Sequence, residues 1–484
     1  MLLFLIGIFI LLVGGYFYSK YVESQLDLDD RPTPAVSKAD GIDFVAMPKW
    51  KNWLINLLNI AGTGPILGPI QGILFGKIAF LAIPIGCVIA GATHDFLVGT
   101  MSMRNGGAQV PKLVGKYLGN GTRKIYNIVI GILLLLTGTV FVYTPGDLLA
   151  NDVMGFADGS KGIWIIYGII FLYYILSTVL PIDQLIGRIY PLFGAFLIIS
   201  AIGVLFGVLT KGASHLEFQG AGYLSEHPLG QRFIPAFFIT VACGILSGFH
   251  GSQVTLVSRT VASERENRAT FYSTMIAEGI IAMIWAAGAM VIFSQGIVPL
   301  DTRATLMVGE ISKYFMGNIG GLLAIIGVIV LPITSGDTAF RSLRLIVAEE
   351  LNIDQKVPVK RIAVAAVLFI PAILILVWAK NDPNGFNLLW RYFGFTNQLV
   401  AIFALATATS YLLNNHNNYW IALIPELFYA FIVFAFIISD KGVGFGADYN
   451  IAYILGAIIS LVIAVLTVRK ARKNQDRIAN IILN

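Results

Sequence analysis

The sequence predicts an all-α polytopic membrane protein with about thirteen transmembrane segments, organised as a 5+5 inverted repeat with extra helices. Its 484 residues are 57% hydrophobic and only 12% charged, whereas soluble proteins carry about 25% charged residues. Apolar stretches of about 18 residues or more, long enough to cross a bilayer as helices, recur from end to end. The stretches are continuous rather than alternating in polarity, which argues against a β-barrel.

The predicted spans have boundaries that are approximate to a few residues. They lie near 2–19, 54–76, 78–101, 125–145, 162–181, 188–210, 233–256, 271–296, 319–340, 361–380, 396–413, 418–438 and 450–469. Residues 2–18 are interpreted as a span rather than a signal peptide, because no charged region precedes them and no small-residue cleavage pattern follows. The longest polar stretches, 20–52, 211–232 and 341–360, are too short for a soluble domain.

We therefore expect residues 1–484 to form a single integral membrane domain. It consists of an additional N-terminal span (1–19), a ten-helix core (54–413) and two additional C-terminal spans (418–469). The sequence contains no nucleic-acid-binding module. Cys87 and Cys243 lie within predicted spans and have neither zinc-site spacing nor a disulfide pattern.

The distribution of basic residues tests the number of spans, because Lys and Arg collect in cytoplasmic loops. With the N-terminus outside and the C-terminus in the cytoplasm, the predicted cytoplasmic segments contain 24 of the 33 Lys and Arg residues. A miscounted span would invert the later loops and spoil this separation. The expected location is the plasma (inner) membrane, with membrane lipid as a partner and the oligomeric state open.

Two spans are interrupted by clusters of helix-breaking residues. Residues 61–69 read Ala-Gly-Thr-Gly-Pro-Ile-Leu-Gly-Pro, and residues 243–252 read Cys-Gly-Ile-Leu-Ser-Gly-Phe-His-Gly-Ser. Gly costs about 1 kcal/mol and Pro about 3 kcal/mol inside a helix. In a membrane such breaks persist where they line a cavity. The alternative is that they are kinks relieved by helix packing.

The two breaks occupy matching positions in the ten-helix core. The first lies in the first core span, which enters from the cytoplasm, and the second lies in the sixth, which enters from outside. Five plus five spans with opposite directions describe an inverted repeat, and paired interruptions of this kind are typical of a transporter's binding site.

The half-helix ends at the breaks predict what could bind there. The second halves, starting near Leu67–Gln71 and Phe249–Gln253, would present N–H groups suited to the carboxylate of a small anionic substrate. We expect the substrate to contact residues from both breaks, with side-chain bonds from the Thr and Ser: Gly62, Thr63, Gly64, Gly68, Ser247, Gly248, Phe249 and His250.

Ionisable residues inside spans are candidates for ion coupling. Glu278 has no basic neighbour in sequence, so it either binds a proton or pairs with another helix. His250 could shuttle a proton or satisfy backbone carbonyls released at the break. Asp95 and His94 close their span near Arg104, so Asp95 is either a third coupling residue or part of an interfacial ion-pair cluster.

Oxygen-bearing residues predict a possible cation site beside the first break. Its members are Ala61, Gly62, Thr334, Ser335 and Asp337, whose oxygens suit a hard cation such as Na⁺. The alternative is an ion pair between Asp337 and Arg341, four residues apart on one helix. No cofactor is expected, and the coupling ion is H⁺ or Na⁺.

Other polar positions have simpler interpretations. Asn397 and Gln398 are expected to form interhelical hydrogen bonds, and Glu426 lies outside the ten-helix core. Trp50 and Trp53 sit where the first half-helix meets the interface, as an inner gate or as membrane anchors.

Several motifs together resemble the carbon starvation protein A (CstA) family. They are residues 61–69, Ala90-Gly-Ala-Thr-His-Asp-Phe96, Cys243-Gly-Ile-Leu-Ser-Gly-Phe-His250, Ala277-Glu-Gly279, Thr334-Ser-Gly-Asp-Thr338 with Arg341, and Phe393-Gly-Phe-Thr-Asn-Gln398. The chain looks like a short member of this family. The resemblance implies a plasma-membrane secondary transporter with a LeuT-like core, whose relatives take up pyruvate with protons, or peptides during carbon starvation.

These observations predict a symporter of a small carboxylate, with pyruvate favoured by the compact site, driven by protons or sodium. A peptide importer is the alternative in the same class. A passive channel, the alternative in another class, would need a continuous polar pore, and most spans lack a polar stripe. No P-loop, HExxH or dinucleotide-binding pattern occurs in context, so an enzyme is not expected.

Overall fold

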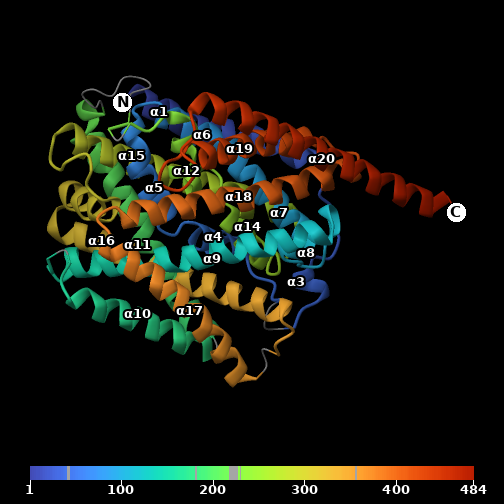
Figure 1. The fold of residues 1–484 in the computed structure, drawn as a ribbon, viewed down its shortest axis with the longest axis horizontal. Helices are drawn as coiled ribbons and strands as arrows, with labels where there is room; N and C mark the ends of the chain where they lie inside the picture. The colour runs from blue at the N-terminus through green and yellow to red at the C-terminus, as the bar shows by residue number, and fades with distance from the viewer. Residues whose placement is uncertain are drawn as a thin grey trace.

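The computed structural model describes residues 1–484 except 41–43, 158, 180–181, 217–226, 229, 355–356 and 484. The chain is helical throughout (Figure 1). Within the described ranges no β-strand occurs, and Met47 and Val261 form an isolated bridge. This confirms the all-α fold class.

Helices and shorter 3₁₀- or π-helical turns, the latter marked η, follow one another along the chain. The first half contains α1 (Leu2–Phe9), η1 (Ile10–Gly14), α2 (Gly15–Ser24), α3 (Pro34–Ser37), α4 (Lys49–Ile60), α5 (Gly64–Gly72), η2 (Ile73–Phe75), α6 (Ala79–Gly86), η3 (Cys87–Gly91), α7 (Ala92–Arg104), α8 (Val110–Leu118), α9 (Asn120–Leu148), η4 (Leu149–Val153), α10 (Gly162–Val179), α11 (Ile182–Thr210) and η5 (Ala213–His215). The second half contains α12 (Phe233–Thr240), α13 (Ala242–Ile245), α14 (Gly248–Val257), η6 (Glu264–Glu266), η7 (Arg268–Tyr272), α15 (Ser273–Ser294), α16 (Ala304–Glu350), α17 (Pro358–Asn381), α18 (Gly385–Asn414), α19 (Trp420–Ser439) and α20 (Tyr449–Leu483).

Over the described residues each predicted span coincides with a helix or a series of helices, and the end of the span predicted at 162–181 lies outside those residues. Among the described residues, nine helices are long and apolar enough to cross a membrane, and the bent pair α4–α5 raises the number to ten. The remaining predicted spans correspond to the shorter apolar stretches Gly162–Ser177 and Gly194–Thr210, and to the broken series α12–α14. The inverted relation between the two halves remains a prediction.

Two prolines inside the spans, Pro84 and Pro145, are followed by a local widening of the helix. Proline has no N–H and clashes with the preceding turn, so the freed carbonyls need another arrangement. The π-helical turn η3 begins three residues after Pro84, and η4 begins four residues after Pro145. The positions of these two π-helical turns thus follow from the positions of the prolines in the sequence.

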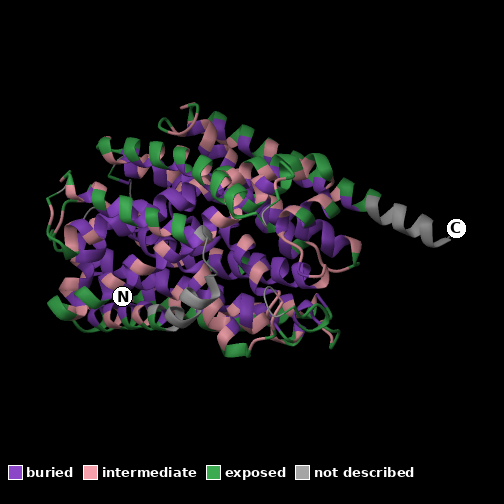
Figure 2. Ribbon diagram, turned by 90° about the horizontal axis from the view of Figure 1, so that it is seen from below, coloured by how far each residue is buried: buried purple, intermediate pink, exposed green. Residues whose placement is uncertain are grey.

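Burial separates central helices from those that face lipid. Within the apolar windows of α15 and α18, 89% of residues are buried, against 28% in the N-terminal span, α17 and α20. In Figure 2 buried residues fill the interior and exposed ones lie on the periphery. In the view of Figure 1, α1 and α20 lie toward one edge and α10 and α17 toward the other. Exposed apolar side chains on these outer helices are expected where the solvent is hydrocarbon.

The segment between α2 and α4 is held against the loop that follows α14. Thr33 donates a hydrogen bond to the Val261 carbonyl oxygen at 2.7 Å, and the Met47 N–H donates to the Thr260 carbonyl oxygen at 2.9 Å. Arg265 donates to both carboxylate oxygens of Asp30, and these hydrogen bonds lower the pKa of that exposed carboxyl. The contacts join two stretches that the distribution of basic residues places on the same face.

Close packing at the second break depends on Gly91. A Cβ atom at this position would lie 2.1 Å from the Ile245 carbonyl oxygen, at the end of α13, and 2.8 Å from Met275 Cε. We expect Gly91→Ala to lower the free energy of unfolding by about 1–3 kcal/mol, because overpacking must displace a backbone group. Thermal denaturation of the purified protein in detergent measures the change.

Gly168→Ala is the matched control, because a Cβ at Gly168 has no heavy atom within 4 Å. This variant should melt at the wild-type temperature. If both alanine variants behave alike, the close approach of η3 to α13 is not a constraint on the fold.

Candidate functional site

The two broken spans meet in the interior of the molecule. α4 and α5 are bent by 50° across residues 61–63. Leu246 and Ser247 adopt extended backbone conformations between α13 and α14. A Cβ at Gly64 would lie 2.2 Å from Cys243 Cβ, so only a residue without a side chain permits this contact. The structure therefore brings together the two segments that the sequence singles out.

The first broken span resumes its helix earlier than predicted. α5 begins at Gly64 rather than near Leu67–Gln71, and the Thr63 carbonyl accepts hydrogen bonds from the N–H groups of Ile66 and Leu67. The reason is Pro65, which lacks an N–H and is tolerated in the first helical turn. Gly68 consequently lies on the second turn, where a Cβ would come 2.8 Å from the Thr240 carbonyl oxygen. It is a helix-packing position rather than a free helix end.

The start of α14 is capped by a side chain from α18. Asn397 Oδ1 accepts a hydrogen bond from the Phe249 N–H at 2.9 Å and another from Ser247 Oγ at 3.2 Å. Its Nδ2 lies 3.4 Å from Cys243 Sγ. Gln398 Nε2 donates to the Phe238 carbonyl oxygen at 2.6 Å. The predicted interhelical hydrogen bonds of both amides are confirmed. In this conformation the Phe249 N–H, one of the groups expected to bind a substrate carboxylate, donates to Asn397 instead.

Phe141 of α9 lies between the two breaks and was missed by the sequence analysis. A Cβ at Gly62 would lie 3.0 Å from Phe141 Cζ, and the rings of Phe141 and Phe249 meet edge to face at 6.2 Å. Both side chains are buried. A phenylalanine in an apolar span carries no signal in the sequence, because its importance depends on which helices surround it.

Four buried ionisable residues form a continuous chain beside the second break. His94 Nδ1 lies 2.8 Å from Asp95 Oδ1, and His250 Nδ1 lies 3.1 Å from Asp95 Oδ2. On the other side of the His250 ring, Nε2 lies 3.4 Å from Glu278 Oε2. All four residues have 0% of their surface exposed. We refer to His94, Asp95, His250 and Glu278 as the buried relay.

The geometry of the buried relay determines which atoms can carry protons. An ionised Asp95 accepts from Nδ1 of both rings, so each neutral imidazole has its proton on Nδ1 and an acceptor at Nε2. The carboxyl oxygens of Glu278 form no hydrogen bond in the structure, and His250 Nε2 is the basic atom that faces them. A proton on Glu278 would thus have an acceptor close by.

The structure places Asp95 away from Arg104, and its role in ion coupling stays a prediction. An interfacial cluster with Arg104 is not present, because Asp95 is fully buried and Arg104 instead pairs with Glu264 at 3.0 Å. Asp95, His250 and Glu278 come from α7, α14 and α15. Each of them stands out separately in the sequence, and folding brings Asp95 and Glu278 into contact with His250.

The candidate cation residues on α16 already have partners inside the protein. Ser177 donates to Asp337 Oδ1, and Arg341 lies 3.8 Å from Asp337 Oδ2, so the predicted ion pair is present. Thr334 donates to the Leu331 carbonyl, whereas the buried Ser335 hydroxyl has no hydrogen bond. Within the described part of the chain no three His, Cys, Asp or Glu side chains are grouped as for a metal. Cation binding together with Ala61 and Gly62 stays a prediction.

The remaining polar candidates lie apart from the breaks. Trp53 Nε1 donates to Ser273 Oγ at 2.9 Å, and Trp50 is 66% exposed, as an interfacial anchor would be. Glu426 accepts hydrogen bonds from Thr409 and Thr467, both at 2.8 Å. It therefore joins α18, α19 and α20 rather than the buried relay.

Another buried carboxylate, Asp147, was missed because the predicted span ended at residue 145. It lies 2.6 Å from Lys380 Nζ, 2.7 Å from Thr305 Oγ1 and 3.5 Å from Arg303 Nη2. These contacts tie α9 to α16 and α17. A boundary two residues later would have identified Asp147 as an ionisable residue inside a span.

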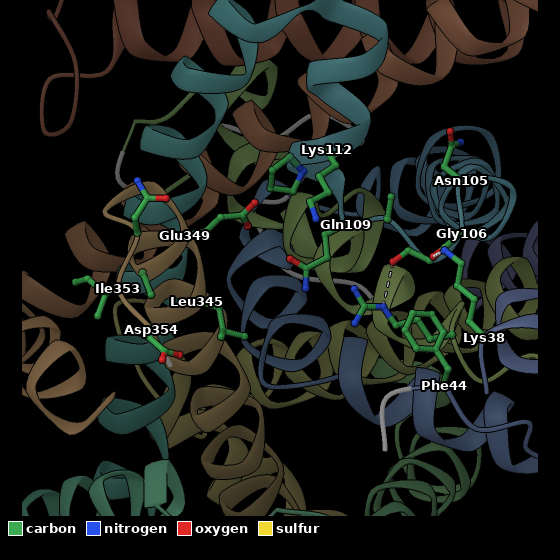
Figure 3. Close-up of a pocket in the computed structure, with 16 residues that line it drawn as sticks. Lys38, Phe44, Asn105, Gly106, Gln109, Lys112, Leu345, Glu349, Ile353 and Asp354 are labelled. Atoms are coloured by element: carbon green, nitrogen blue, oxygen red, sulfur yellow. Dashed lines mark hydrogen bonds between the residues drawn. The ribbon is translucent and has the colours of Figure 1, made fainter. Parts of the chain in front are cut away.

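A large cavity opens on the face that carries most of the basic segments. It measures about 780 Å³, and its lining includes Lys38, Phe44, Gln109, Lys112, Glu349 and Asp354. Figure 3 shows Glu349 and Asp354 on one side, Lys38 and Phe44 on the other, and Gln109 and Lys112 between them. A smaller cavity of about 20 Å³ shares Gln109 with it and reaches α14. We call the larger cavity the vestibule.

Comparisons with known proteins agree with the resemblance seen in the motifs. A family model described as carbon starvation protein CstA matches residues 1–157, 149–316 and 286–435. An uncharacterized membrane protein of Haemophilus influenzae is 40% identical over 334 residues, covering 59% of this chain and 89% of the relative.

Two relatives from Escherichia coli carry functional names. The peptide transporter CstA is 25% identical over 558 residues, covering 86% of this chain and 77% of that protein. The pyruvate/proton symporter BtsT is 27% identical over 353 residues, covering 58% of this chain and 48% of that protein.

Solved structures support the fold. A manganese transporter of Eremococcus coleocola superposes with a TM-score of 0.59 at 12% identity, covering 89% of this chain and 98% of that one. At this identity the likeness concerns the arrangement of helices and not the cargo.

The cap on α14 is testable by removing the Asn397 amide. Asn397→Ala leaves the Phe249 N–H and the Ser247 hydroxyl without this partner, so we expect the free energy of unfolding to fall by about 1–3 kcal/mol. Asn387→Ala, on the same helix, removes only an exposed contact to Asn384 and should cost less than about 0.5 kcal/mol. Equal melting temperatures for the two variants would contradict the proposed cap.

Proposed function

Because the chain belongs to the carbon starvation protein CstA family, we propose that it imports a small carboxylate, pyruvate first of all, together with a proton. The observation that carries this proposal is the buried relay beside the two helix breaks. A secondary transporter needs a substrate site and an ion site that respond to the same movement, and here they share one segment. His250 belongs both to the second break and to the relay.

Glu278 is the proposed proton carrier. An ionised carboxylate in the membrane interior is costly unless a cation compensates it, and the group facing Glu278 is a histidine that is itself bonded to Asp95. Glu278 therefore holds a proton in this conformation and releases it when the pathway opens. Movement of α14 would change the distance between His250 and Glu278 and so couple proton release to substrate movement.

The substrate carboxylate would bind where the breaks meet. In place of Asn397, it would accept hydrogen bonds from the Phe249 N–H and the Ser247 hydroxyl. Thr63 supports this location, because its hydroxyl is fully buried at the first break and has no hydrogen-bond partner. Phe141 and Phe249 fill the space between the breaks, so these rings must separate for a ligand to enter.

The proposed location is the plasma membrane, with the N-terminus outside and the C-terminus in the cytoplasm. The excess of Lys and Arg in alternate loops supports this orientation. The vestibule then opens to the cytoplasm, since its lining comes from those basic segments. Membrane lipid surrounds the protein as its partner, and the proposed transport involves no nucleic acid.

A peptide is the second candidate substrate. It is favoured by the longer alignment with the peptide transporter CstA of Escherichia coli, which covers 86% of this chain. A peptide also presents a carboxylate, so the same half-helix ends would serve it. Sodium is the alternative coupling ion, for which Asp337 and the unpartnered Ser335 hydroxyl are the candidates.

Uptake into proteoliposomes tests the proposal. Labelled pyruvate and a labelled tripeptide are offered in turn, with an imposed proton gradient or an imposed sodium gradient. We expect pyruvate to accumulate above its external concentration when the proton gradient points inward. Equilibration without accumulation would indicate a passive channel, and no uptake of either compound would contradict the transporter proposal.

Glu278→Gln separates substrate binding from proton coupling. The amide resembles a protonated carboxyl in shape but cannot release a proton. We expect the variant to exchange internal for external pyruvate while losing proton-driven accumulation. Wild-type accumulation in this variant would exclude Glu278 as the carrier.

Thr63→Val tests the substrate site, because valine has the shape of threonine without the hydroxyl. Loss of one neutral hydrogen bond, worth about 0.5–1.5 kcal/mol, should raise KM for pyruvate by about 2- to 12-fold. The melting temperature should stay unchanged, since the hydroxyl has no partner in the protein. Thr63→Ser retains the hydroxyl and is the control. An unchanged KM in Thr63→Val would remove Thr63 from the site.

A further inference from the structure

We propose that His94 passes the transported proton from the buried relay to the cytoplasmic vestibule, through the space beside Gly251. This inference rests on the proposed proton coupling and assigns its exit route. It gives His94 a role distinct from that of Glu278, which binds the proton during transport.

The first observation is the orientation of the His94 ring. Nδ1 faces Asp95, while Nε2 is buried and has no hydrogen-bond partner. An imidazole bonded on one side only, at the end of a chain of ionisable groups, is suited to transfer a proton onward. Gly251 lies beside this nitrogen, since a Cβ at that position would be 3.9 Å from His94 Nε2, an ordinary contact distance.

The second observation is a small cavity lined by neighbours of Gly251. The same Cβ position lies 3.4 Å from Val110 Cγ2, and Val110 lines the small cavity together with Ser252 and Thr255. Its volume of about 20 Å³ is enough for one water molecule. The hydroxyls of Ser252 and Thr255 donate to backbone carbonyls. The Thr255 oxygen is thus an acceptor for such a water, and the Ser252 oxygen, which accepts from Gln253, keeps a second lone pair.

The third observation is the connection to the vestibule. Gln109 and Pro111 line both cavities, and Gln109 lies centrally in the vestibule (Figure 3). The basic residues that line the vestibule are Lys38, Lys112 and Arg259, and the acidic ones are Glu349 and Asp354. Around His94 itself, the facing ionisable groups are Asp95 and, through it, His250.

Proton transfer along the relay balances at every atom. The Glu278 carboxyl gives its proton to His250 Nε2, and His250 Nδ1 gives one to Asp95 Oδ2. Asp95 gives a proton from Oδ1 to His94 Nδ1, and His94 Nε2 gives one to water. These transfers start from a relay in which Asp95 carries a proton on Oδ1 and His94 carries its proton on Nε2, so that every atom that gives a proton holds one and every atom that accepts is free. One proton leaves, and Glu278 ends ionised.

Accessibility of position 251 tests the route without any transport. A Gly251→Cys variant is exposed to Ag⁺, a small thiol-reactive ion, in inside-out and in right-side-out vesicles. Protection of the new thiol from later alkylation in denaturant is then measured by mass spectrometry. We expect protection by Ag⁺ in inside-out vesicles only. Ser252→Cys is the positive control, and the buried Cys87 and Cys243 of the wild type provide the background.

Protection from the opposite side, or none at position 251 while Ser252→Cys reacts, would overturn the proposed route. Because this result does not depend on substrate, it is informative even if the protein proves not to carry pyruvate. Failure of the proposed function and failure of the exit route are thus distinguished.

Proton flux in proteoliposomes tests the role of His94. His94→Gln keeps an amide that can bond Asp95 but has no titratable nitrogen. We expect net pyruvate-driven proton flux, followed with an internal pH dye, to fall by about 100-fold. The melting temperature should stay close to wild type, which a purely structural role of His94 would not predict.

Two further variants complete the comparison. Gly251→Ala places a methyl group at ordinary contact distances, 3.4 Å or more from its neighbours, so it should fold normally and slow net proton flux. His215→Gln, in the described turn η5, replaces a histidine remote from the relay and should leave the flux unchanged. Wild-type net flux in both His94→Gln and Gly251→Ala would overturn the proposal.

Discussion

Every backbone group released at a helix break in the membrane interior must find a partner without help from water, and the centre of this protein is organised by that requirement. At the second break the partner of the Phe249 N–H is the side chain of Asn397. At the first break the Thr63 carbonyl accepts from the N–H groups that follow it. The breaks are therefore stable structures with specified partners, and a ligand can enter only by exchanging one of them.

Ionisable side chains in the membrane interior also need a partner, because no water is there to solvate their charge. Charges near the two faces are compensated by direct ion pairs, such as Arg104 with Glu264 and Lys380 with Asp147. In the centre, by contrast, Asp95 and Glu278 are joined through imidazoles, whose charge depends on a proton. An ion pair of fixed charges holds helices together, whereas a carboxyl paired with histidine can change its charge. This difference is why the centre is suited to ion coupling and the periphery to stability.

Close helix contacts make the two halves mechanically dependent on each other. The absence of a side chain at Gly64 lets the first break touch Cys243, and Gly91 lets η3 approach the carbonyl at the end of α13. Phe141 then contacts the residues that flank both breaks. A shift of one broken helix must displace these neighbours, because the contacts leave little free space. Alternating access would follow from such coupled displacement.

The amino-acid sequence by itself determined the membrane class, the order of the spans, the location of both breaks and the family, because hydrophobicity and backbone-breaking residues act locally. It also identified Asp95, His250 and Glu278 as exceptional, since a charge inside an apolar span is costly wherever the span packs. Only the tertiary structure decided that these residues touch, that Asn397 caps α14, that α5 starts at Gly64 and that Phe141 lies between the breaks. Those features depend on distances between helices far apart in the chain, and no local pattern encodes such distances.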